Sequence, residues 1–205
     1  AELGEAISKF GFVSLTDHGL SPVMIGQFYD SARAVFDLGP DNLVRYEDAE
    51  SYHQVGYTPL ETETSKGSKI PNSMQFWAVL RACATYKNIW PEEVPEFRER
   101  CQWLFGTLDE LSMVLFAMLS RFSGLEDDYF PDMIELGDSM LRVIDYPELT
   151  EEELETKVRS AEHEDICLGT LLITSGVAGL EILPREDGWM PVNNPPGSII
   201  FNTGD

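Results

Sequence analysis

One long apolar stripe sets the first limit on how this chain folds. Apolar side chains recur at alternating intervals of three and four residues, at Val94, Phe97, Cys101, Leu104, Leu108, Leu111, Leu115 and Met118. This spacing places them on one face of an α-helix. We therefore expect a long helix that ends near Gly124 and buries this stripe in a hydrophobic core.

The chain before this helix is expected to be mainly helical. The expected elements are helices at 2–9 and 21–39, a short strand at 12–16, and a polar loop at 40–75 that contains a fixed turn at 56–60. Pro22 suits the first turn of a helix, and Gly39 followed by Pro40 suits the end of one.

The chain after the long helix changes to short strands. A short helix is expected near 126–136 and a strand at 139–147. Four further apolar segments are separated by turn signals, namely HEDICLGTLLIT (163–174), GLEIL (179–183), WMPV (189–192) and SIIFN (198–202). Helices followed by strands indicate an α+β fold, with a helical layer packed on an antiparallel sheet or barrel. We divide the chain into a helical region, 1–137, and a β-rich region, 138–205.

The charge limits the partners of the protein. The net charge is −22, and much of the acid lies in surface-like runs at 92–96, 125–128 and 150–155. Nucleic acids and anionic membranes attract clustered Lys and Arg, so neither is expected as a partner. We identify no membrane-spanning run and no leader, and we expect a soluble, cytoplasmic protein whose three cysteines are reduced.

The tripeptide His163-Glu164-Asp165 stands directly before an apolar run. Burying charge is costly unless the charge is paired or bound to a metal. In a strand, His163 and Asp165 would face one side and Glu164 the other. An imidazole and a carboxylate are two members of the 2-His-1-carboxylate triad that binds non-haem Fe(II). The alternative is a surface histidine paired with a neighbouring carboxylate, which an acidic protein produces by chance.

Several motifs resemble one enzyme family in the same order along nearly the whole chain. HEDICLGTLLIT, GLEILPREDGWMPV and NPPGSIIFNTGD resemble the core of the isopenicillin-N-synthase-like Fe(II)/2-oxoglutarate oxygenases. KFGFVSLTDHGL, GYTPLETETSKG and LRVIDYP resemble earlier segments of that family. The resemblance implies a double-stranded β-helix (jelly-roll) core packed with N-terminal helices.

The resemblance also implies roles for individual residues. His163 and Asp165 match the family's Fe(II) ligands, and Tyr146 matches a tyrosine near the co-substrate or substrate. Arg142 and Ile144 share strand parity with Tyr146, so all three could face one cavity. We expect Tyr146 and Arg142 to contact 2-oxoglutarate, although many relatives have Asn at the position of Ile144.

Four other polar residues are not expected to take part in the chemistry. His18 is interpreted as a turn residue and His53 as a solvated loop residue. Asn202 and Asp205 fit the family's Asn-x-Gly-Asp motif, where we expect turn hydrogen bonds.

The family places its second histidine ligand, and an Arg-x-Ser that binds 2-oxoglutarate, after the Asn-x-Gly-Asp motif. Both are therefore expected beyond Asp205, and the barrel is expected to be incomplete in this chain. The implied function is hydroxylation, desaturation or cyclisation of a small organic substrate with Fe(II), 2-oxoglutarate and O2. Two alternatives are an iron oxidase of the isopenicillin N synthase type that does not use 2-oxoglutarate, and a non-catalytic truncated barrel that acts as a binding or scaffold protein.

Overall fold

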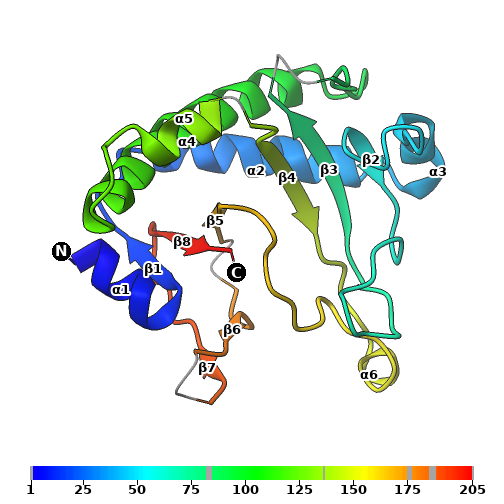
Figure 1. The fold of residues 1–205 in the computed structure, drawn as a ribbon. Helices are drawn as coiled ribbons and strands as arrows, with labels where there is room; N and C mark the ends of the chain where they lie inside the picture. The colour runs from blue at the N-terminus through cyan, green and yellow to red at the C-terminus, as the bar shows by residue number, and fades with distance from the viewer. Residues whose placement is uncertain (1, 82–84, 136, 175–176, 185–187, 205) are drawn as a thin grey trace. The chain divides into compact units, whose positions relative to one another are not determined.

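The computed structural model describes residues 2–81, 85–135, 137–174, 177–184 and 188–204. Its helices are α1 (Glu2–Phe10), α2 (Pro22–Phe36), α3 (Pro40–Leu43), the 3-10 helix η1 (Val44–Tyr46), α4 (Pro95–Phe122), α5 (Tyr129–Glu135) and α6 (Glu151–Leu154) (Figure 1). Its strands are β1 (Phe12–Leu15), β2 (Gly56–Thr58), β3 (Gln75–Leu80), β4 (Met140–Asp145), β5 (Gly169–Ile173), β6 (Glu181–Ile182), β7 (Met190–Pro191) and β8 (Ile199–Thr203).

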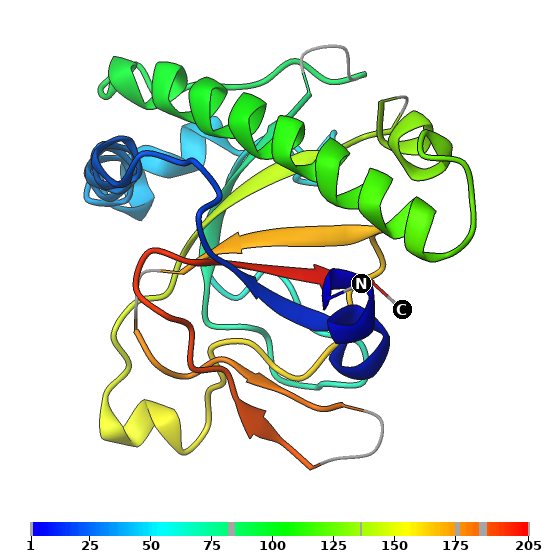
Figure 2. The ribbon, with the colours of Figure 1, turned by 90° about the vertical axis from the view of Figure 1, so that its left-hand side faces the viewer.

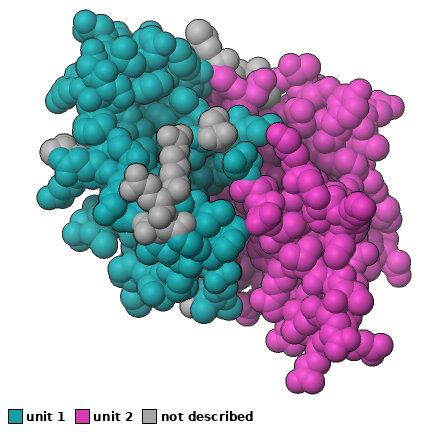
Figure 3. Space-filling model, turned by 60° about the horizontal axis from the view of Figure 1, so that its bottom comes forward, with its two compact units in different colours: residues 1–22, 106–136, 164–205 teal, residues 23–105, 137–163 magenta. Residues whose placement is uncertain are grey.

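The chain forms two compact units, which are coloured separately in Figure 3. Unit 1 contains residues 1–22, 106–136 and 164–205, and unit 2 contains residues 23–105 and 137–163. Each unit contains residues from both the helical region, 1–137, and the β-rich region, 138–205. The division at 137/138 therefore describes the order of elements along the chain, and it stays a prediction.

Unit 1 is built on an antiparallel sheet in the order β1-β8-β5, whose strands lie side by side in Figure 2. The central strand β8 pairs Phe201 with Val13 on one side and with Leu171 on the other. The core cluster on this face consists of Leu3, Leu115, Phe116, Leu119, Ile134 and Phe201. Helices α1, α4 and α5 therefore contribute to the packing on one face of this sheet. β6 and β7 form a separate antiparallel pair.

Unit 2 is built on an antiparallel sheet in the order β2-β3-β4. Trp77 on the central strand β3 is fully buried. Its ring lies 5.4 Å from that of Tyr46 and 5.7 Å from that of Phe97, measured between centroids. Phe28 of α2 stacks on Phe97 at 6.5 Å. Aromatic side chains from α2, η1, β3 and α4 thus form the centre of this core.

The structure confirms the helices expected at 2–9, 21–39 and 126–136, and the strands expected at 12–16 and 139–147. The second helix ends at Phe36, and Gly39 adopts a φ of 79° immediately before α3. The long helix α4 has the expected position, and its buried stripe residues include Phe97, Cys101, Leu104 and Leu115. Met118, at the end of the stripe, is half-exposed.

Two strands, one within the expected loop at 40–75 and one that begins at its last residue, differ from the expectation. Residues 56–58 form strand β2 where a fixed turn was expected, and Tyr57 pairs with Trp77 of β3. Gly56 has a φ of 76°, and a Cβ there would lie 2.3 Å from the backbone oxygen of Tyr46. Glycine at this position therefore lets β2 pass close to η1. Strand β3 itself was not expected from the sequence.

Helix α4 corrects the expectation that no run could span a bilayer. By length and composition alone it is long and apolar enough to do so, with a mean hydropathy of 1.3 over its most apolar window. Core helices of soluble proteins pass the same test, and α4 contributes to the cores of both units through Phe97 and Phe116.

Candidate metal centre

His163 and Asp165 lie on an irregular segment, which corrects the expectation that they begin a strand. Strand β5 starts only at Gly169. The ladder with β8 begins at Gly169, opposite Thr203, and a Cβ at Gly169 would lie 2.8 Å from the backbone oxygen of Asn202. Ile166, before it, is fully exposed. The alternation of side chains along a strand therefore does not predict the directions of the His163 and Asp165 side chains. The boundary between the two units falls between His163 and Glu164.

His163 is an exposed residue of unit 2 whose ring is held by the backbone. Its Nδ1 lies 2.8 Å from the carbonyl oxygen of Ala161. A carbonyl only accepts hydrogen bonds, so Nδ1 carries the proton and the lone pair of the neutral imidazole is on Nε2. This is the tautomer that a histidine needs to bind a metal through Nε2.

Asp165 is a partly buried residue of unit 1 whose carboxylate is held by two side chains. Oδ2 accepts hydrogen bonds from Oγ1 of Thr170 at 3.0 Å and from Nδ2 of Asn202 at 2.9 Å. Thr170 and Asn202 stand directly opposite each other on β5 and β8. Carboxylates that bind metals are themselves commonly hydrogen-bonded in this way. Asn202 thus supports the candidate ligand, rather than only a turn as expected.

A close approach between backbone segments explains why the Asn-x-Gly motif has glycine at position 204. A Cβ there would lie 1.8 Å from the backbone oxygen of Cys167 and 2.8 Å from that of Asp165. Only glycine lets the end of β8 approach the segment that carries Asp165 so closely. Asp205, the last residue of the motif, lies outside the described residues.

Replacement of Asn202 should weaken metal binding through Asp165. Asn202 is only 5% exposed and donates directly to the carboxylate. We expect Asn202→Ala to lower the affinity for Fe(II) about 10–100-fold, because the carboxylate loses a donor that orients it. Anaerobic Fe(II) titration measures the change. Asn42→Ala is the matched control, since the side-chain amide of Asn42 donates to the carbonyl oxygen of Leu38 on an exposed surface of unit 2. Equal affinity in the two variants would contradict the prediction.

Arg142 and Tyr146, expected near the co-substrate, both lie in unit 2. Val143 is buried, while its neighbours Arg142 and Ile144 are partly exposed. This pattern confirms that Arg142 and Ile144 lie on the same face of β4. Nη2 of Arg142 lies 2.6 Å from Oε2 of Glu63, and its guanidinium stands 3.8 Å from the ring centroid of Phe76.

Tyr146 follows β4 by one residue. Burial raises the pKa of its hydroxyl, which also has a hydrogen bond with Ser160. Tyr146 therefore stays a neutral phenol that can donate or accept a hydrogen bond at neutral pH. That Tyr146 and Arg142 contact 2-oxoglutarate remains a prediction.

The other two histidines differ in their surroundings. Nε2 of His18 lies 2.7 Å from the carbonyl oxygen of Gly197, and the N–H of Leu20 donates to its Nδ1, as suits a turn residue. His53 is not the solvated residue expected, because its Nδ1 is buried and lies 3.8 Å from Oε1 of Glu47. Within the described part of the chain, no group of three or more His, Cys, Asp or Glu side chains could hold a metal ion.

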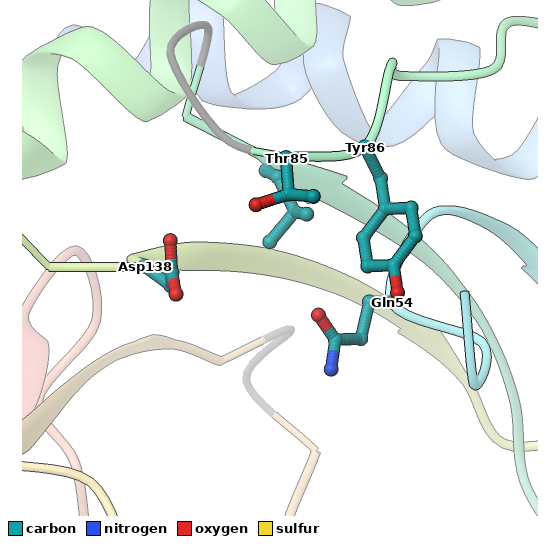
Figure 4. A pocket seen from close by; sticks show the side chains of 5 residues that line it. Gln54, Thr85, Tyr86 and Asp138 are labelled. Atoms are coloured by element: carbon teal, nitrogen blue, oxygen red, sulfur yellow. The ribbon is translucent and has the colours of Figure 1, made fainter.

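Two hollows occur in unit 2. The first, of about 180 Å³, is lined by Gln54, Leu80, Thr85, Tyr86 and Asp138 (Figure 4). Leu80 pairs with Met140, so this hollow lies where β3 ends and β4 begins, about 20 Å along β4 from Tyr146. The second, of about 260 Å³, is lined by Lys66, Gly67, Ser68, Ala161 and Glu162. Only the second adjoins the segment that carries His163.

Comparisons with known proteins agree with the motifs. Residues 1–93 match the family model described as "non-haem dioxygenase in morphine synthesis N-terminal". The chain is 24% identical over 208 residues to the "2-oxoglutarate-Fe(II) type oxidoreductase" of Aspergillus fumigatus, covering 94% of this chain and 62% of the relative. It is 25% identical over 205 residues to "Flavanone 3-dioxygenase 2" of Oryza sativa subsp. japonica, covering 99% of this chain and 58% of the relative. The chain thus spans less than two thirds of the length of either relative.

Solved structures show the same fold. A protein from Caulobacter crescentus described as a member of the 2OG-Fe(II) oxygenase family matches with a TM-score of 0.85 and 31% identity, over 100% of this chain and 68% of the other. A full-length Neurospora crassa protein solved in complex with alpha-KG matches with a TM-score of 0.89 and 19% identity, over 100% of this chain and 66% of the other. These matches confirm the α+β class, with an incomplete jelly-roll core in this chain.

Proposed function

The chain belongs to the Fe(II)/2-oxoglutarate oxygenase family, and we propose that its protein oxidises a small organic substrate with O2 while 2-oxoglutarate is converted to succinate and CO2. The observation that carries the proposal is the support around the two candidate ligands. His163 is held in the tautomer with its lone pair on Nε2, and Asp165 is oriented by Thr170 and Asn202.

We assign Nε2 of His163 and the carboxylate of Asp165 as two Fe(II) ligands. A neutral imidazole and a carboxylate are the donor types that this metal takes in oxygenases. When bound, the iron supplies the centre at which O2 and 2-oxoglutarate react. The protein's own contribution is to keep the imidazole and the carboxylate in their binding forms, through Ala161 on one side and Asn202 on the other.

Arg142 and Tyr146 are proposed to orient the co-substrate or the substrate. Arg142 already binds one carboxylate, that of Glu63, and a guanidinium that is partly exposed can exchange one carboxylate for another. The neutral hydroxyl of Tyr146 can donate a hydrogen bond to a carboxylate. The relatives named for flavanone oxidation support a small organic molecule as the class of substrate.

The test uses the natural polypeptide in its full length. Fe(II) is titrated anaerobically with and without 2-oxoglutarate, and succinate is measured after air is admitted. We expect 2-oxoglutarate to tighten metal binding, and succinate to form only when both are present. Zn(II), which has no redox chemistry, is the control metal and should give no succinate.

Two results would overturn the proposal in different ways. O2 uptake that needs Fe(II) but not 2-oxoglutarate would indicate an iron oxidase of the isopenicillin N synthase type. No effect of 2-oxoglutarate, with no O2 uptake on a panel of small organic substrates, would indicate a non-catalytic barrel.

A further inference from the structure

Residues 61–73 form a polar loop, here called the strap, that is fastened to the segment just before His163. Asn72 of the strap is only 4% exposed. Its Oδ1 accepts a hydrogen bond from the backbone N–H of Ala161 at 2.9 Å, and its Nδ2 donates to Oγ of Ser65 at 3.1 Å. Oγ of Ser65 lies 3.3 Å from both the carbonyl oxygen of Ala161 and Oδ1 of Asn72, and its single proton is assigned to Ala161 because that Oδ1 already accepts from the Ala161 N–H. The strap therefore holds both polar groups of Ala161.

Further contacts fix the strap at both ends. The backbone N–H of Ser73 donates to the carbonyl oxygen of Val158 at 2.8 Å. Nζ of Lys157 lies 2.9 Å from Oε1 of Glu61. The strap and the segment 157–163 lie side by side near α6 in Figure 1, and all of these residues belong to unit 2. The position of Ala161 is thus set by residues that lie far earlier in the chain.

The carbonyl oxygen of Ala161 links the strap to the candidate ligand. It accepts from Ser65 of the strap and lies 2.8 Å from Nδ1 of His163. A displaced carbonyl would release the ring, because the hydrogen bond that selects the Nδ1–H tautomer would be lost. The order of contacts runs from Asn72 and Ser65, through the Ala161 backbone, to His163.

We infer that Asn72 and Ser65 are positioning residues that hold His163 in the orientation and tautomer needed to bind the metal. The inference rests on the proposed function, since it assumes that His163 is a ligand. Neither residue is adjacent to the candidate ligands in sequence. Their action is indirect, and the loss of such supporting contacts typically lowers metal affinity about 10–100-fold.

The experiment compares three variants of the full-length polypeptide. Asn72→Ala removes the bonds to Ala161 and Ser65, and Ser65→Ala is a milder change that removes one hydroxyl. Ser68→Ala is the matched control, because Ser68 lies on the same strap and its hydroxyl bonds to the backbone of Ile70 rather than to Ala161. Anaerobic Co(II) titration, followed by the absorption of the bound ion, gives the metal affinity. ¹⁵N NMR of the metal-free protein gives the His163 tautomer.

We expect Co(II) affinity to fall about 10–100-fold in Asn72→Ala and by a smaller factor in Ser65→Ala, with no change in Ser68→Ala. The Nδ1–H tautomer of His163 should dominate in the wild type and lose population in Asn72→Ala. Wild-type affinity and tautomer in both variants would overturn the inference while the proposed function stands. A wild-type protein that binds no Co(II) would overturn the proposed function, and this inference with it. If Asn72→Ala does not fold, Ser65→Ala against Ser68→Ala decides.

Discussion

Replacing His163 with alanine should abolish specific Fe(II) binding by the full-length polypeptide. The imidazole supplies a neutral nitrogen, already in the Nδ1–H form, that alanine cannot replace. The loss should exceed the roughly 10–100-fold decrease expected when only a supporting contact is removed. Anaerobic titration measures the affinity directly. Metal at about 100 times its dissociation constant should also stabilise the wild type against unfolding by about 2.7 kcal/mol, and this gain should vanish in the variant.

His53→Asn is the matched control for this replacement. His53 adopts a φ of 59°, which asparagine tolerates better than most residues, and it lies beside Glu47 in a different part of unit 2. The control should bind Fe(II) like the wild type. If His163→Ala binds Fe(II) as tightly as the control, His163 is not a ligand, and the metal centre proposed above is wrong.

The features that could be predicted from sequence are those with a local signal. The long helix was predictable because its apolar stripe repeats from Val94 to Met118. Residues of the stripe pack in the core, as Phe97 does against Trp77. His163 and Asp165 were selected because charge directly before an apolar run needs a partner. In the structure His163 is exposed and only Asp165 is partly buried, with donors from Thr170 and Asn202, so the role of both as metal ligands stays a prediction.

The features that could not be predicted depend on distant contacts. FWAVL of β3 is a continuous apolar run, because β3 lies between two strands and is buried on both faces, so it shows no alternation. The start of β5 was misplaced because the backbone at 163–168 is irregular and the ladder with β8 begins at Gly169, opposite Thr203. Asn72 had no local signal, since its partner Ala161 lies 89 residues away.

Replacing Trp77 with alanine should cause the largest loss of stability among the variants considered. The indole is fully buried on the central strand β3, packs against Tyr46 and Phe97, and donates from Nε1 to the carbonyl oxygen of Ile89 at 3.2 Å. Alanine would leave a large cavity and remove the hydrogen bond to the carbonyl oxygen of Ile89. We expect a decrease of about 3–5 kcal/mol in the free energy of unfolding, measured by urea denaturation followed by circular dichroism.

Two further variants test how much of this loss comes from the hydrogen bond and how much from burial of the side chain. Trp77→Phe keeps an aromatic ring but removes the N–H donor, so it should cost about 1–3 kcal/mol, less than alanine. Trp189→Ala is the same chemical change at a residue that is 50% exposed, and it should cost less than about 1 kcal/mol. Similar losses at Trp77 and Trp189 would show that Trp77 is not the centre of the unit 2 core. Because β3 pairs with β4, which carries Arg142 and leads into Tyr146, loss of that core should also disturb the proposed co-substrate residues.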